Sequence, residues 1–189
     1  MGSMPTVIFD YNRTIYDPDN DCLMPHAKQM LDDLKENRVK LFLIAKGDDE
    51  RKKKIEQLGL VPYFERIIVN KSKSAEDYQS CKDTYPEETD FFAVGDRVKE
   101  EIRHANSCGI TTIWFRNGKF ANEKSENDLE KPKFTVQSLK EVYSIVWDDH
   151  YTPAQLQEFD RIAREAKQGK NLSRAFSSME EMFEDLHKN

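Results

Sequence analysis

Short apolar runs alternate with amphipathic segments along the first 150 residues of the chain. Five runs of the length and composition of buried strands cover residues 7–10, 39–45, 67–69, 90–96 and 110–115. Between the first two, Met30, Leu31 and Leu34 fall on one face of a helical pattern. Strands that alternate with helices at this spacing predict an α/β fold, with a five-stranded parallel sheet covered by helices on both faces and connected by right-handed crossovers.

Capping residues predict where these helices begin and end. Pro25 opens a helix that stops near Asn37, Asp48 caps a helix that Gly59 closes, and Ser74 caps one that runs to about Cys81. A capping box of Ser138 and Glu141 opens a last helix that buries Leu139, Val142, Val146 and Trp147. All five predicted strands lie before about residue 116, and a polar loop covers residues 116–131.

The amino-acid composition of the chain argues against several classes of function. Of 189 residues, 38% are hydrophobic and 34% charged, and a net charge of −6 argues against general nucleic-acid or membrane binding. No run approaches the roughly 18 apolar residues of a membrane span, and no signal peptide opens the chain, so we expect a cytoplasmic protein. The cysteines, Cys22, Cys81 and Cys108, are too widely spaced to suggest a disulfide framework or a zinc site.

Polar side chains follow three of the predicted strands. Asp10 and Asn12 follow the first strand, Lys71 and Lys73 the third, and Asp96 and Glu101 the fourth. Because the carboxyl ends of parallel strands meet at one edge of the sheet, we expect these groups to lie together. Hard oxygen ligands with a lysine suit Mg²⁺-assisted phosphoryl transfer, in which one carboxylate attacks phosphorus. The alternative for Asp10 is a turn-capping role.

Two of these segments resemble motifs of the haloacid dehalogenase (HAD) superfamily, over about residues 5–147. Its first motif, D-x-D-x-T, is similar to residues 10–14, and its fourth, G-D-x-x-x-x-D/E, is similar to residues 95–101. The helix and strand of residues 105–113 also resemble the family's next elements. The resemblance implies a Rossmann-like sheet and an aspartyl-phosphate enzyme that uses Mg²⁺.

The resemblance also implies roles for individual residues. Asp10 would be the nucleophile and a metal ligand, and the Asn12 backbone carbonyl and Asp96 would be further Mg²⁺ ligands. Lys71 would steady the phosphate, with Lys73 as the alternative. Thr14, together with the second-motif segment Ala45, Lys46 and Gly47, would contact the substrate, the latter two through backbone N–H groups.

Two positions depart from the family pattern. Asn12 stands where family phosphatases carry a second aspartate that protonates the leaving group, and an amide cannot act as that acid. Ala45 stands where the second motif ends in Ser or Thr, which removes a hydroxyl from the phosphate site. These changes leave a metal site in place and put turnover in question.

The chain has no interval long enough for a cap domain. About two dozen residues with one helix separate the first two motifs. Uncapped members of the family tend to act on large substrates or to be covered by a second subunit. The resemblance therefore implies a phosphorylated, macromolecular or partner-presented substrate.

After residue 149 the pattern changes from alternating strands and helices to helices alone. This change predicts a domain of residues 4–149 and a C-terminal extension of residues 150–189. Two amphipathic helices start at capping boxes of Thr152 with Gln155 and of Ser178 with Glu181. Residues 163–173 and 176–181 resemble the toxin-binding tail of RelB/DinJ-type antitoxins. The helices either pack on the domain or hold another chain, so a catalytically impaired binding protein is the alternative to an enzyme.

Overall fold

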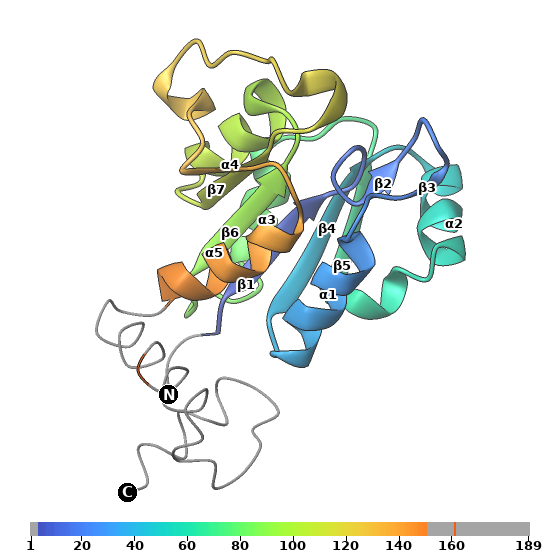
Figure 1. The fold of residues 1–189 in the computed structure, drawn as a ribbon, viewed down its shortest axis with the longest axis horizontal. Helices are drawn as coiled ribbons and strands as arrows, with labels where there is room; N and C mark the ends of the chain where they lie inside the picture. The colour runs from blue at the N-terminus through green and yellow to red at the C-terminus, as the bar shows by residue number, and fades with distance from the viewer. Residues whose placement is uncertain (1–3, 151–160, 162–189) are drawn as a thin grey trace, which may run out of the picture.

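The computed structural model describes residues 4–150 and residue 161, and these form a parallel α/β sheet with helices on both faces (Figure 1). The sheet has the order β5-β4-β1-β6-β7-β8, and every neighbouring pair of strands is parallel. The strands are β1 (Thr6–Asp10), β4 (Lys40–Lys46), β5 (Arg66–Asn70), β6 (Phe91–Gly95), β7 (Thr111–Phe115) and β8 (Phe134–Val136). The predicted fold class is confirmed. The predicted tail helices lie outside the described residues, and the domain boundary at residue 149 stays a prediction.

Strand β8 is a sixth strand that the sequence pattern did not predict. It pairs with β7 in parallel register, with Trp114 beside Thr135. It has three residues, of which Phe134 is half-buried and Thr135 exposed, so it carries too few apolar positions to be recognised. The prediction that all strands precede residue 116 is therefore wrong for this edge of the sheet.

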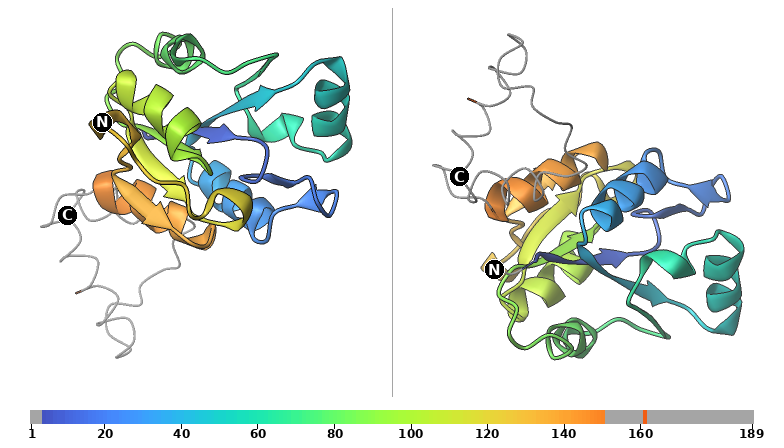
Figure 2. Two further views of the ribbon diagram at one scale, coloured as in Figure 1. Left: turned by 90° about the horizontal axis from the view of Figure 1, so that it is seen from above. Right: turned by 90° about the horizontal axis from the view of Figure 1, so that it is seen from below.

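Two hydrophobic clusters hold the helices to opposite faces of the sheet. Val7 and Phe9 of β1 pack with buried residues of α1 (Ala27–Glu36), α2 (Asp49–Gln57) and α5 (Lys140–His150). Ile8 faces the other way and packs with buried residues of α3 (Ala75–Lys82) and α4 (Arg103–Ser107). The views along the sheet show these layers (Figure 2). Every residue of β1 is buried, which is typical of the centre of a parallel sheet.

The predicted helix ends agree with the structure. The Asp48 side chain accepts a hydrogen bond from the Glu50 N–H at the start of α2. The Glu141 carboxylate accepts from the Ser138 N–H (2.8 Å) at the start of α5. Gly59 follows α2 in the left-handed region, with φ +67°, a conformation that costs glycine no steric strain.

The connections between strands are short among residues 4–150. Between β1 and β4 lie α1 and a two-stranded hairpin of β2 (Tyr16–Asp17) and β3 (Cys22–Leu23), and between β5 and β6 lies α3. Neither connection holds a cap domain. Short 3₁₀ turns, Gly118–Phe120 and Asp128–Glu130, break the predicted loop after β7. Within this part of the chain, each helix is too short or too polar to cross a bilayer.

Candidate active site

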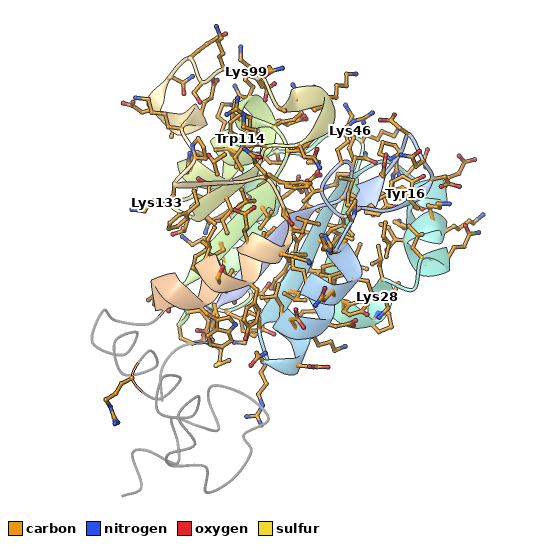
Figure 3. All side chains as sticks on the ribbon, in the orientation of Figure 1. Tyr16, Lys28, Lys46, Lys99, Trp114 and Lys133 are labelled. Atoms are coloured by element: carbon orange, nitrogen blue, oxygen red, sulfur yellow. The ribbon has the colours of Figure 1, made fainter. Side chains whose placement is uncertain are left out.

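The carboxyl ends of the central strands open into a cavity of about 320 Å³. Figure 3 shows Lys46, the last residue of β4, and Tyr16, which follows β1, toward this end of the sheet. The cavity is lined by Asp10, Asn12, Arg13, Pro18, Lys46, Arg51, Lys73, Asp96, Arg97, Glu100, Glu101 and Phe120. Residues separated by up to 110 positions along the chain thus meet where the sequence predicted a site.

Asp10 ends β1 and is 1% exposed. The Thr14 hydroxyl donates a 2.9 Å hydrogen bond to Asp10 Oδ2, so Thr14 orients the carboxylate. The turn between them is held by the Ile15 N–H, which donates to the Tyr11 carbonyl (3.0 Å). Arg13 takes a left-handed conformation in this turn (φ +61°) and pairs with Asp19. Thr14 itself is fully buried behind Asp10 rather than in the cavity wall.

Lys73 is the lysine that the fold brings to Asp10. Its ammonium group forms ion pairs with Asp10 Oδ1 and Glu101 Oε1, and its side chain is only 5% exposed. Burial alone would lower the pKa of Lys73, but the negative charges of Asp10 and Glu101 raise it above its ordinary value. Lys71 is exposed and does not line the cavity. Of the two lysines that the sequence offered, the structure therefore places the alternative, Lys73, in the cavity wall beside Asp10, and not the first choice, Lys71.

The turn before Lys73 is fixed by Asp77 at the start of α3. One Asp77 carboxylate oxygen accepts from the Asn70 side-chain amide (2.6 Å), and the other accepts from the Ser74 N–H (2.9 Å). These bonds tie the end of β5 to the first turn of α3. Lys73 lies between Asn70 and Ser74, the two residues that Asp77 binds, and its ammonium group contacts Asp10.

Asp96 and Glu101 complete a buried acidic cluster with Asp10. One carboxylate oxygen from each of the three residues lies within 4.8 Å of the others. Burial raises the pKa of Asp96 to about 8, and the charges of Asp10 and Glu101 add to this shift. Burial and the charge of Asp10 raise the pKa of Glu101 to about 7. Lys73 therefore supplies too little positive charge for three carboxylates.

The cluster fits a divalent cation. Asp96 Oδ2 is buried and has no hydrogen-bond partner in the described part of the chain, an arrangement that costs free energy unless a cation or donor satisfies it. Three carboxylates are a donor set suited to Mg²⁺, which prefers oxygen ligands. Glu101 is placed here by the π-helical turn Val98–Ile102, and the Arg97 N–H donates to its Oε2 (3.1 Å). The motif resemblance had assigned Asp96 to the metal but not Glu101.

The remaining predicted site residues divide between the cavity and the core. Asn12 lines the cavity, and its side-chain oxygen is buried without a hydrogen-bond partner among the described residues. Lys46 is exposed at the cavity wall. Ala45 is fully buried in the hydrophobic core and does not reach the cavity lining. Gly47 lies against the side chain of Arg51.

Sequence reasoning missed two arginines of the cavity wall. Arg97 forms ion pairs with Glu100 and Glu123 and stacks on Phe120, with 4.5 Å from its guanidinium carbon to the ring centroid. The second arginine, Arg51, lies in the first half of α2. Its place one turn into the helix that follows β4 is the signal that could have found it, because that turn borders the edge of the sheet where the site lies.

Comparisons with known proteins find hydrolases and phosphatases that are similar to this chain. A protein-family model described as HAD-hydrolase-like matches residues 73–142. Glyceraldehyde 3-phosphate phosphatase from Methanocaldococcus jannaschii is 30% identical over 134 residues, which cover 65% of this chain and 55% of that protein. The Methanopyrus kandleri phosphatase of the same name is 26% identical over 131 residues, with the same coverage. The chain spans about half the length of these curated relatives.

Solved structures share the fold at lower identity. HAD-hydrolase YfnB from Bacillus subtilis, whose crystal structure contains magnesium, gives a TM-score of 0.62 at 14% identity and covers 76% of this chain and 99% of its own. The core domain of a phosphoglycolate phosphatase from Streptococcus pneumoniae gives 0.54 at 21% identity, with 75% and 94% coverage. At these identities the likeness concerns the arrangement of the sheet and helices.

Proposed function

Because this chain belongs to the HAD superfamily, we propose that it is a phosphohydrolase or phosphotransferase whose nucleophile is Asp10. The observation that carries the proposal is the contact of the buried Asp10 carboxylate with Lys73 and Thr14 at the cavity wall. A carboxylate buried at a strand end and directed by two donors is suited to attack on an electrophile.

In the proposed reaction, a carboxylate oxygen of Asp10 attacks the phosphorus atom of a phosphomonoester. The bond between phosphorus and the leaving oxygen breaks, and the phosphoryl group is carried on Asp10. Water or a second hydroxyl group then attacks phosphorus, and the Asp10 carboxylate is released. Lys73 stays protonated throughout and offsets negative charge on the phosphoryl oxygens.

We assign the metal to Asp10, Asp96 and Glu101, with the Asn12 backbone carbonyl as the further ligand that the family resemblance implies. When bound, Mg²⁺ neutralises charge on the transferring phosphoryl group. Thr14 keeps one Asp10 oxygen engaged, so the two oxygens of this carboxylate are not equivalent.

In this proposal the protein does not supply a proton to the leaving oxygen. Asn12 lines the cavity, but its amide N–H is too weak an acid to protonate the alkoxide as the bond breaks. We therefore expect turnover to be best for leaving groups that depart as stable anions, such as aryl oxides. A second, slower step would be hydrolysis of the phosphoryl group on Asp10.

The test is phosphate release from an aryl phosphate by the full chain with Mg²⁺. Asp10→Asn should reduce turnover to background, since an amide oxygen is a poor nucleophile. Asp128→Asn, which removes a carboxylate that is 95% exposed and outside the cavity lining, is the matched control and should leave turnover unchanged. Turnover that survives Asp10→Asn would contradict the proposal.

We further propose that the substrate presents its phosphoryl group from a large molecule or from a partner. The connections after β1 and β5 hold no cap among the described residues, so the cavity stays open to a bulky phosphate ester. A phosphopeptide should then be turned over with kcat/KM at least as high as that of its free phosphoamino acid. A clear preference for the free amino acid would contradict this part of the proposal.

A cytoplasmic location is also proposed. Cys22, Cys81 and Cys108 are free thiols, and Cys81 is buried, which fits a reducing compartment. Fluorescence microscopy of the tagged full chain would test it.

The second candidate function is a binding protein that retains the fold but hydrolyses phosphate esters poorly. Asn12 at the cavity wall favours it, because the usual acid is missing. On this reading, residues 150–189 hold a protein partner or a second copy of the chain, and their deletion should abolish the complex while the sheet stays folded. Unchanged partner binding after deletion would contradict this candidate.

A further inference from the structure

The basic residues of the cavity wall are not all neutralised. Five of them line it, and they are Arg13, Lys46, Arg51, Lys73 and Arg97. Three form ion pairs, since Arg13 contacts Asp19, Lys73 contacts Asp10 and Glu101, and Arg97 contacts Glu100 and Glu123. Within the described part of the chain, Lys46 and Arg51 have no carboxylate partner. These two cations are left to face the cavity.

Arg51 packs on the rings of Tyr11 and Tyr16 and against Gly47. Its guanidinium carbon lies 4.9 Å from the centroid of the Tyr11 ring and 5.9 Å from that of Tyr16, and the two rings stack 5.0 Å apart. Its aliphatic stem crosses Gly47, where an added Cβ would lie only 2.5 Å from Arg51 Cβ. The guanidinium is therefore preorganised for a ligand at low entropic cost.

One donor beside these rings lacks an acceptor. Arg51 Nε is buried and makes no hydrogen bond within the described residues. A buried donor without an acceptor costs free energy, and an oxyanion in the cavity, which Arg51 lines, would satisfy it.

The position of Lys46 places this anion site beside the nucleophile. In the register of β4 against β1, Ile44 is the partner of Asp10, and Lys46 lies two residues further along β4. Neighbouring strands are about 4.8 Å apart, so an anion near Lys46 and one bound at Asp10 can belong to one small molecular fragment. The Asp10 side carries the phosphoryl group in the proposed function.

We propose that Arg51 and Lys46 form a second anion subsite, so that the preferred substrates are phosphomonoesters with a second oxyanion close to the phosphate. This inference rests on the proposed function, because it takes the Asp10 site as the phosphoryl site. The planar guanidinium group of Arg51 favours two-pronged contact with a carboxylate or phosphate group. Lys46 adds positive charge at the mouth of the cavity.

Binding of phosphonates, which cannot be hydrolysed, tests the subsite separately from turnover. The probes are methylphosphonate, with one anionic group, and phosphonoacetate, which adds a carboxylate. The affinities are measured by calorimetry on the full chain at fixed free Mg²⁺. Phosphonoacetate should bind at least about tenfold more tightly than methylphosphonate, which is the factor expected for one charge-assisted contact. Methylenediphosphonate replaces the carboxylate with a second phosphonate and tells which oxyanion is preferred.

Three variants assign the preference to Arg51. In Arg51→Gln, the affinities for phosphonoacetate and methylphosphonate should differ by no more than about threefold. In Arg51→Lys, which keeps the charge, the ratio of the two affinities should lie between that of Arg51→Gln and that of the native chain. Lys53→Gln is the matched control, because Lys53 is an exposed cation of the same helix outside the cavity lining. It should leave the ratio unchanged.

The outcomes separate this inference from the proposed function. If methylphosphonate binds but phosphonoacetate binds no tighter, or if Arg51→Gln and Arg51→Lys both keep the native ratio, the second subsite is overturned while the phosphoryl site stands. If neither phosphonate binds, both proposals are overturned. Release of phosphate from an aryl ester, measured in parallel, bears on the proposed function alone.

Discussion

The side chain of Glu101 packs directly on the backbone of Gly95. A Cβ atom on Gly95 would lie 2.5 Å from Glu101 Cβ and 2.8 Å from Glu101 Cγ, closer than side chains approach one another. The last residue of β6 therefore has to be glycine for the π-helical turn to bring Glu101 to Asp10 and Asp96. The acidic cluster depends on this close approach as much as on its carboxylates.

Gly95→Ala should displace Glu101 from the cluster. Overpacking of this kind costs roughly 1 to 3 kcal/mol in the free energy of unfolding, measured by urea denaturation. We also expect weaker Mg²⁺ binding by calorimetry. The control is Gly59→Ala, where an added Cβ meets no atom within 4 Å but the positive φ strains the backbone. It should lower stability without changing the affinity for Mg²⁺, and equal loss of affinity in both variants would contradict the role of Gly95.

Lys73→Met should remove the one ammonium group that contacts Asp10 among the residues that the structure describes. At pH 8 we expect the free energy of unfolding to fall by about 3 kcal/mol, because loss of one partner leaves buried charge unpaired. The loss should be smaller at pH 6, where the carboxyl groups can take up protons. Aryl phosphate turnover should fall to background.

Lys71→Met is the matched control for this prediction. Lys71 is exposed and lies outside the cavity lining, so stability and turnover should both stay near native values. A larger effect at Lys71 than at Lys73 would restore the first assignment from the sequence.

Without metal, the protein should lose stability as pH rises. The pKa values of Asp96, about 8, and Glu101, about 7, exceed those of ordinary carboxyl groups, so the folded state holds more protons than the unfolded state from about pH 4 to pH 8. The stabilisation is complete below the unfolded pKa and is lost as pH rises through 7 and 8. From pH 6 to pH 9 in EDTA, we expect a loss of at least about 1 kcal/mol.

Two controls identify the source of this pH dependence. Asp96→Asn removes one titrating group and should flatten the curve in EDTA. Mg²⁺ should also flatten it, since a bound cation compensates the charges that appear as pH rises. A curve with the same slope in EDTA, in Mg²⁺ and in the variant would show that other groups dominate.

Asn12→Asp should restore a general acid at the cavity wall. We expect a rise in kcat/KM of roughly 10² to 10⁴ for alkyl phosphates, whose leaving oxygens need a proton, and a smaller rise for aryl phosphates. Steady-state kinetics with one ester of each kind measures the difference. Equal gains for both leaving groups would mean that the new carboxylate acts through charge or metal binding rather than through proton transfer.

The sequence was sufficient for the order of the first five strands of the sheet and of the helices between them, and it placed Asp10 and Asp96 at strand ends, because buried strands and the residues that end them are local patterns. It could not separate Lys71 from Lys73. That choice depends on Asp77, which fixes the turn through Asn70 and Ser74. The place of Arg51 in the cavity wall could not be predicted for a similar reason, because it depends on packing against Tyr11, 40 positions away in sequence.

Strand β1 lies at the centre of the sheet, between β4 and β6, although it is the first strand of the chain. During synthesis from the N-terminus, one edge of this fully buried strand has no partner until Phe91–Gly95 has emerged. An open edge of an apolar strand can pair with another chain. Chains truncated before residue 91 should therefore aggregate more readily than chains that include β6.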